Sequence, residues 1–182
     1  LSMNESKAID PRVSMKYRFT NQTDVALAWG RQSSMQTPGI YFTSVDGIDF
    51  PNRSLPLIHS DQWVLALTHL FKNGLRIQLE GYHQKLSNVP VNTDQNQIFW
   101  ALNTFKGFTN KTLRPDGLGR NYGIDAVIEK TFQSGSFFIL SGSVYSSTFQ
   151  TKKGGKVYNT RYNGRYALTF SGGKNWQLNR TT

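Results

Sequence analysis

Apolar and polar residues alternate along several stretches of the chain, beginning at residues 12–20. The odd positions from Val13 to Phe19 are apolar, and the even positions between them are polar or charged. A period of two residues predicts a strand with one apolar face. The same pattern predicts six further strands, at 24–32, 61–71, 75–86, 120–132, 136–149 and 158–171. A turn is expected at 172–175, with an eighth strand beginning near Trp176.

The connections between these strands are of two kinds. Short turns are expected at 21–23, 72–74 and 133–135, and Asn73-Gly74 supplies the positive φ values that a tight hairpin needs. Long polar loops are expected at 33–60, 87–119 and 150–157. The prolines and glycines of the first loop argue against regular structure, whereas residues 98–102 suit a short strand or helix. A sheet with short turns at one end and long loops at the other is typical of outer-membrane β-barrels.

Strand length and aromatic positions favour the same architecture. The expected strands run from about 9 to 14 residues, and about 9–11 residues cross a bilayer at a tilt. Aromatic residues near the ends of membrane strands form two belts at the level of the lipid headgroups. One belt is expected beside the short turns, at Phe19, Phe71, Phe132 and Phe137. The other is expected near the loops, at Trp29, Tyr82, Tyr122, Tyr145 and Tyr158.

Bulk composition narrows the function classes. The 182 residues carry a net charge of +10, yet no nucleic-acid-binding motif accompanies the basic residues, so a nucleic-acid partner is not expected. The mean hydropathy of −0.48 resembles that of a soluble protein. It also suits a membrane barrel, because strands with a polar lumen face keep mean hydropathy low.

Residues that could carry catalysis or bind a metal are not arranged for it. The chain has no cysteine, and its three histidines lack metal-ligand spacing. Asp125 and Glu129 are four residues apart on one strand, which separates them by about 13 Å. The glycines of 117–123 miss the dinucleotide-binding pattern, and a strand follows them instead of a helix. The sequence therefore predicts no enzyme, no cofactor and no metal site.

Several short motifs in the second half of the chain resemble one known family. They read RNYGID at 120–125, EKTF at 129–132, SGSVY at 141–145, NTRYNG at 159–164 and GGKNW at 172–176. In this order and spacing they are similar to the late barrel strands of TonB-dependent outer-membrane receptors, especially those of Bacteroidetes-type bacteria. DPRV at 10–13 and AWGR at 28–31 resemble a strand entry and a strand exit of the same family. The resemblance covers nearly the whole chain.

The resemblance implies that residues 1–182 are part of one all-β domain. This part is an antiparallel up-and-down meander of seven or eight strands from a transmembrane barrel of about 22. It lacks the plug domain, the TonB-binding segment and a signal peptide, so we expect an open, curved sheet with unpaired edges. The implied function is import of a siderophore, cobalamin or a glycan across the bacterial outer membrane. The implied partners are outer-membrane lipid, the TonB complex through absent regions, the ligand and a surface lipoprotein.

Loop residues are the candidates for contact with that ligand. Aromatic and amide side chains stack on small molecules or hydrogen-bond to them, and the two longest loops provide Tyr41, Phe42, Asn96, Phe99 and Trp100. Packing of the loops against one another is the alternative role for these residues. Two alternatives to the receptor also stay open: a passive porin or adhesion barrel without a plug, and a soluble β-barrel that binds a ligand.

Overall fold

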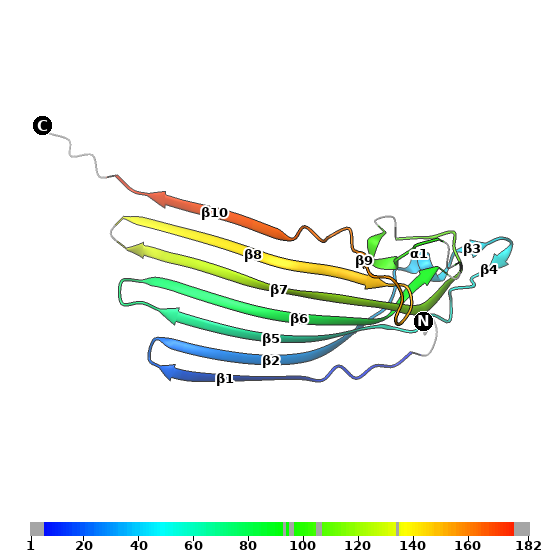
Figure 1. Cartoon of the computed structure of the whole chain (residues 1–182), viewed down its shortest axis with the longest axis horizontal. Helices are drawn as coiled ribbons and strands as arrows, with labels where there is room; N and C mark the ends of the chain where they lie inside the picture. The colour runs from blue at the N-terminus through cyan, green and yellow to red at the C-terminus, as the bar shows by residue number, and fades with distance from the viewer. Residues whose placement is uncertain (1–5, 93, 95–96, 105–106, 134, 177–182) are drawn as a thin grey trace, which may run out of the picture.

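A computed structural model describes residues 6–92, 94, 97–104, 107–133 and 135–176 of the chain. These residues form one eight-stranded antiparallel sheet and a separate two-stranded hairpin. In Figure 1 the long strands lie side by side, with tight turns at one end and long connections at the other. The expected all-β antiparallel meander is confirmed.

Seven long strands follow one another across the sheet in chain order. They are β1 (Arg12–Thr20), β2 (Thr23–Ser34), β5 (Ile58–Leu70), β6 (Leu75–Asn92), β7 (Leu113–Gln133), β8 (Ser136–Gln150) and β10 (Tyr166–Lys174). The short β9 (Tyr158–Asn159) also pairs with β8, nearer the loop end than β10 does. The sheet does not close on itself. Strands β1 and β10 are its two edges, and each pairs with one neighbour among the described residues.

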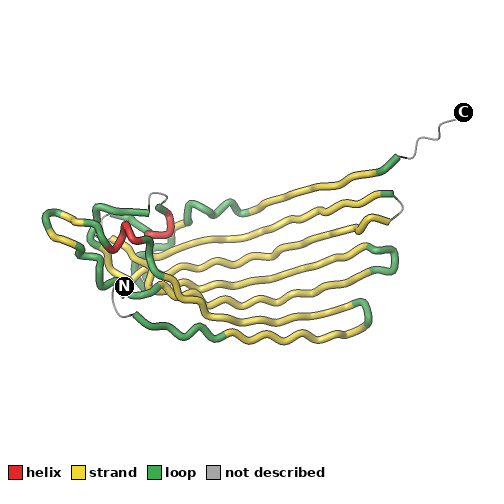
Figure 2. The backbone as a smooth tube through the Cα atoms, turned by 180° about the vertical axis from the view of Figure 1, so that it is seen from behind, coloured by secondary structure: helices red, strands yellow, loops and turns green. Residues whose placement is uncertain are grey.

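Each short turn has its own local chemistry. At 72–74 the positive φ expected for the Asn-Gly pair occurs only at Gly74, whose φ is 76°. The Asn73 side chain instead accepts a hydrogen bond from the Leu75 N–H over 3.2 Å. Gly135 has a φ of 75° in the turn between β7 and β8. Glycine occupies this region without the steric cost that a Cβ would impose. Figure 2 shows these turns at the end of the sheet opposite the loops.

The prediction of one strand over 158–171 is wrong. The chain leaves the sheet after β9 and returns at β10, with Arg165 in the left-handed region at φ 69°. Side-chain bonds replace the ladder here: the Ser147 N–H donates to Asn163 Oδ1 over 3.0 Å, and Asn163 Nδ2 donates to Asn159 Oδ1 over 2.9 Å. Asparagine readily supports such local turns.

The turn predicted at 172–175 is also wrong, because β10 continues to Lys174. Gly172 and Gly173 lie opposite Phe138 and Phe137. A Cβ at Gly173 would approach the Phe137 ring to 2.7 Å, so this glycine provides space for an aromatic ring and does not bend the chain. Trp176 itself lies in no strand, and the strand expected after it falls on residues outside the described ranges.

The long loops contain more structure than predicted. Residues 33–60 include helix α1 (Pro38–Tyr41) and the hairpin β3 (Ser44–Val45) and β4 (Ile48–Asp49). Strands β6 and β7 extend well into 87–119, where Val89 pairs with Gly117. The element expected at 98–102 is a β-bridge between Trp100 and Val91, followed by the 3₁₀ turn η1 (Ala101–Asn103).

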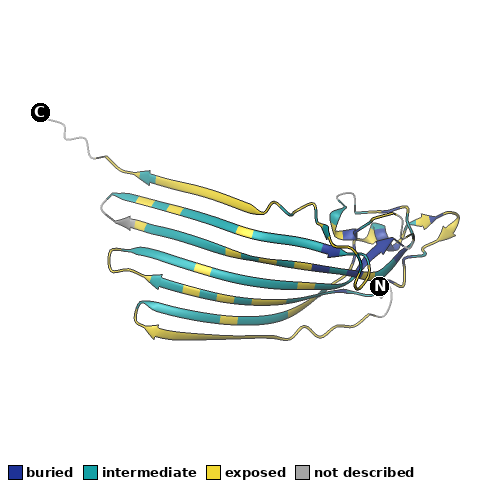
Figure 3. Ribbon diagram, in the orientation of Figure 1, coloured by how far each residue is buried: buried dark blue, intermediate teal, exposed yellow. Residues whose placement is uncertain are grey.

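The loops fold into a small cap at their end of the sheet. Its core is a cluster of buried apolar side chains: Ile40, Tyr41, Leu55, Ile58, Val89, Val91, Trp100, Ala101, Leu113 and Phe149. Figure 3 shows the buried residues gathered at this end, while the long strands are intermediate or exposed. The main apolar core of the described residues therefore lies in the cap, and the long strands have no covering layer. None of the described helices is long and apolar enough to span a membrane.

Candidate functional site

One face of the sheet is apolar from edge to edge. Residues paired across antiparallel strands share a face. Following the pairs from one strand to the next gives a row across the whole sheet: Met15, Leu27, Leu65, Gly81, Ile124, Val144 and Tyr166. Most of its large side chains are open to the surroundings: Leu65 is 55% exposed, Ile124 63% and Leu168 75%. We call this surface the apolar face. A water-soluble monomer rarely exposes a continuous apolar area of this extent.

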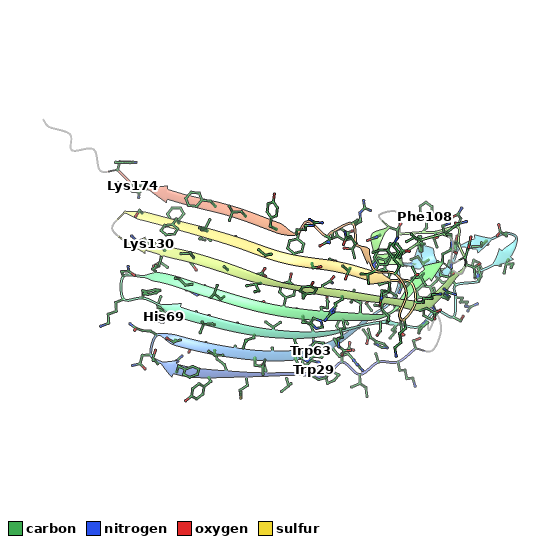
Figure 4. All side chains as sticks on the ribbon, in the orientation of Figure 1. Trp29, Trp63, His69, Phe108, Lys130 and Lys174 are labelled. Carbon is green, nitrogen blue, oxygen red and sulfur yellow. The ribbon has the colours of Figure 1, made fainter. Side chains whose placement is uncertain are left out.

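Aromatic rings border the apolar face near the loops. Trp29, Trp63, His83 and Tyr122 lie opposite one another on consecutive strands. In Figure 4, Trp29 and Trp63 lie close together toward the loop end of β2 and β5. Two residues expected in the belt near the loops, Trp29 and Tyr122, therefore lie in one row, and Trp63 belongs to the same row although the sequence analysis did not name it.

Other residues expected in the two belts lie elsewhere. Tyr82 and Tyr145 pair with Val64 and Gly123 and face the opposite side of the sheet. Tyr158 packs on the cap core. Near the turns Phe19 and Phe71 are present as expected, whereas Phe138 shares the apolar face in place of Phe137. The Phe132 side chain lies outside the description. Successive residues of a strand face opposite sides of the sheet, and a position near a strand end does not reveal the side, which explains the errors at Tyr82, Tyr145 and Phe137.

Basic residues lie at both ends of the apolar face. Lys130 and Lys174 are near the turns, and Lys85 and Arg120 lie opposite each other just beyond the aromatic row near the loops. Figure 4 shows Lys130 and Lys174 close to the turn end. The distance from Tyr122 to Lys130 along β7 is eight residues, or about 26 Å.

A shallow depression of about 610 Å³ lies in the middle of the apolar face. Gly81 forms its floor between Leu65 and Ile124, and a Cβ added at Gly81 would meet no atom within 4 Å. Trp63, His83 and Tyr122 form the end of the depression nearest the loops. A single glycine in an otherwise bulky row thus creates an apolar groove.

The opposite face is polar and carries a continuous line of hydrogen bonds. Gln84 Nε2 donates to Ser60 Oγ over 2.7 Å, and Asn121 Nδ2 donates to Gln84 Oε1 over 2.7 Å. Ser147 Oγ donates to Asn121 Oδ1 over 2.7 Å, and Thr160 Oγ1 donates to Ser147 Oγ over 2.6 Å. We call this line the polar ladder. It joins β5, β6, β7 and β8 and fixes the orientation of their amide groups.

A second depression of about 440 Å³ lies on the polar face near edge strand β1. Ala28 and Gly30 leave room there, and Ser14, Gln32 and Gln62 offer hydrogen-bonding groups around it. A hydrophilic solute bound there would exchange its hydrogen bonds to water for hydrogen bonds to these side chains.

Charged groups on the polar face include one ion pair between strands and one pair of carboxylates on facing positions. Glu129 accepts from Arg76 over 3.0 Å, and Asp125 lies opposite Glu80. The described residues contain no group of three or more histidine, aspartate or glutamate side chains that could hold a metal ion. Outside the long strands, hydrogen bonds from Ser33 lower the pKa of Asp10 and fasten the segment before β1 to β2.

The loop residues proposed for ligand contact are separated by the fold. Tyr41 and Trp100 are 1% and 3% exposed, and both belong to the cap core, where Trp100 stacks on Phe149. A ligand could reach these rings only if the cap opened. Phe99 packs partly against that core, and exposed Phe42 contacts Phe50 edge-to-face. Asn96 lies outside the described residues.

The cap packs on the polar face at the loop end. The Trp100 ring of the cap stacks on Phe149. Phe149 shares the polar face with Gly119 and Leu86, which lie opposite it on β7 and β6 in turn. A Cβ at Gly117 would lie 2.4 Å from the Val89 carbonyl and 2.7 Å from the Trp100 ring. Gly117 and Gly119 therefore allow close packing of the cap, which the sequence pattern alone did not reveal, whereas Gly123 makes room for the Tyr82 and Tyr145 side chains.

No family model and no curated protein matches this chain.

Proposed function

We propose that this chain is a section of the transmembrane β-barrel of a TonB-dependent receptor in a bacterial outer membrane. The observation that carries the proposal is the uncovered apolar face, bounded by aromatic and basic residues at both ends. In water such a face would cause aggregation. Against lipid hydrocarbon it is stable, because aliphatic side chains meet acyl chains while Trp, Tyr, Lys and Arg reach the headgroups.

The polar face supports a lumen-facing role. Amide and hydroxyl groups of the polar ladder are hydrogen-bonded to one another yet only partly buried, which suits a surface in contact with water or with another polar domain. In the proposed receptor that domain is the plug. The plug and the TonB-binding segment belong to other regions of the protein.

The cap supports the proposed import of a scarce nutrient. It packs on the polar face at the loop end. In the proposed receptor a cap in this position restricts access to the lumen from the side opposite the tight turns. A siderophore, cobalamin or glycan would meet this cap first, and exposed Phe42 remains a candidate contact. In this proposal a surface lipoprotein would bind on the loop side, and the ligand would be imported without chemical change, so the chain is no enzyme.

Energy-dependent uptake tests the receptor against a passive porin. Cells that produce the full-length protein are supplied with radiolabelled ferrichrome, cyanocobalamin or maltoheptaose, with and without a protonophore. The proposal predicts uptake of one of these ligands above that of cells lacking the protein. It also predicts loss of that uptake when the inner-membrane proton gradient collapses.

The control is a diffusible sugar such as arabinose, whose passage through a porin does not depend on the gradient across the inner membrane. If uptake of the radiolabelled ligand, like that of arabinose, were unchanged by the protonophore, the result would favour the porin alternative. Recovery of the full-length protein as a folded monomer in detergent-free buffer would contradict both membrane functions.

A further inference from the structure

The loop end of the apolar face brings two cations together on the loop side of the groove at Gly81. Lys85 and Arg120 lie directly opposite each other on β6 and β7. Side chains of like charge in such a pair repel each other at a distance of about 5 Å between Cβ atoms. Asp61 lies directly opposite Lys85 on β5, but its two side-chain bonds, of 2.8 and 2.9 Å, are to Arg31. The row of Arg31, Asp61, Lys85 and Arg120 therefore contains three cations and one carboxylate.

Aromatic rings orient both cations without neutralising them. The Lys85 Nζ lies 5.7 Å from the Trp63 ring centre, and the Arg120 guanidinium lies 5.6 Å from that of Tyr122. Arg120 also donates to His83 over 3.1 Å. Neither Lys85 nor Arg120 forms an ion pair with another described residue. An anion placed between them would relieve their repulsion.

The groove lies on the same face as these cations, on the far side of the row of Trp63, His83 and Tyr122. Gly81 is four residues from Lys85 along β6, or about 13 Å. The groove is lined by Leu27, Leu65, Ile124 and Val144, and it holds about 610 Å³. An aliphatic chain is the occupant that such walls favour. An anionic group joined to a chain that descends from it would satisfy the cations and the groove together.

We propose that Lys85, Arg120 and the groove at Gly81 form a binding site for a phosphate-bearing membrane lipid. The phosphate lies between the two cations, and one acyl chain lies over Gly81. This inference rests on the proposed membrane location of the apolar face. It adds a specific lipid site to a surface that otherwise needs only hydrocarbon.

The test uses the full-length protein in nanodiscs that contain phosphatidylcholine and a low fraction of phosphatidylglycerol with the same acyl chains. Native mass spectrometry of the released protein counts the lipids that remain bound. We expect the wild-type protein to retain phosphatidylglycerol in preference to phosphatidylcholine. In the double variant Lys85→Gln/Arg120→Gln, the ratio of bound phosphatidylglycerol to bound phosphatidylcholine should fall about tenfold. The matched control, Lys152→Gln/Lys153→Gln, removes the same charge from an exposed loop and should retain the wild-type preference.

A second pair of variants tests the groove. Gly81→Leu fills it and should reduce retention of both lipids, whereas Gly81→Ala adds one methyl group in open space and should leave retention unchanged. Glycerol 3-phosphate, which has the anion without the chains, should not displace the bound lipid at equal concentration. Displacement by glycerol 3-phosphate would overturn the role of the groove and with it the lipid site.

The nanodisc experiment separates this inference from the proposed function. Protein that enters the discs but shows equal lipid preference in wild type and Lys85→Gln/Arg120→Gln would overturn the lipid site alone. Protein that stays outside the discs would overturn the membrane location and therefore both proposals.

Discussion

Two asparagines show how one residue type serves two environments in this chain. Asn52 is fully buried in the cap, where its Nδ2 donates to the Lys111 carbonyl over 2.9 Å and its Oδ1 accepts from the Leu113 N–H over 2.8 Å. Asn121, in the polar ladder, also makes two side-chain hydrogen bonds, to Gln84 and Ser147, each of 2.7 Å. Its side chain is only half-buried. Water can replace the partners of Asn121 if the polar face lines an aqueous lumen.

Alanine substitution at these two positions tests that difference. We expect Asn52→Ala to lower the free energy of unfolding by about 2–4 kcal/mol, because one buried and one partly buried backbone group lose their partner. Asn121→Ala should cost less than about 1 kcal/mol, because water takes over its bonds. Urea titration of the full-length protein in liposomes measures both values. An equal, large cost at both positions would mean that the polar face is dry.

At the residue scale, the sequence predicted the alternation of faces but not every member of each face. The pattern assigned Met15, Leu27 and Ile124 to apolar positions, as observed. It placed Tyr82 and Tyr145 in the aromatic belt, because position near a strand end does not reveal which way a side chain faces. It also missed Lys85 and Arg120 as a pair, since only the register between β6 and β7 brings them together.

At the element scale, the two ends of the sheet differ in the way the sequence predicted. The connections near Gln22, Asn73 and Gly135 are tight, whereas those at the other end include α1, η1 and the β3–β4 hairpin. The errors concern the strand ends. Strands β6 and β7 run further into the loops than their alternation suggested. In β6 the four residues at 89–92 are all buried, so polar residues are not needed at alternate positions there.

Peptide tags test which end of the strands faces the outside of the cell. A FLAG tag inserted after Gly154, an exposed loop position with no atom within 4 Å of an added Cβ, should bind antibody on intact cells. The same tag inserted after Asn73, in a tight turn, should bind only after the outer membrane is permeabilised. Immunofluorescence of cells that produce the full-length tagged protein measures antibody binding at each of the two positions.

Permeabilised cells carrying each tag serve as the control for tag integrity, since both should then be labelled equally. Antibody binding at Asn73 and none at Gly154 on intact cells would contradict the proposed orientation.

At the scale of the whole molecule, the described residues form an open sheet with two edge strands. The outer sides of β1 and β10 have no neighbouring strand among the described residues, and the side chains of β1 are exposed along its whole length. Unpaired edges of this length recruit further strands. In the proposed receptor those strands come from the rest of the barrel. The sequence indicated this openness through strand number alone, because seven long strands with one bulky apolar face are too few for a barrel of the resembled type.

The central claim is that the apolar face contacts lipid hydrocarbon and the polar face contacts water. Leu65 and Ala66 are adjacent on β5 and face opposite sides, and the chain has no cysteine of its own. Nitroxide labels at Leu65→Cys and Ala66→Cys, in full-length protein with no other cysteine and reconstituted in liposomes, report collisions with oxygen and with a nickel chelate. We predict that oxygen dominates at 65 and the nickel chelate at 66. Preference for the nickel chelate at both positions, or for oxygen at 66 alone, would contradict the account.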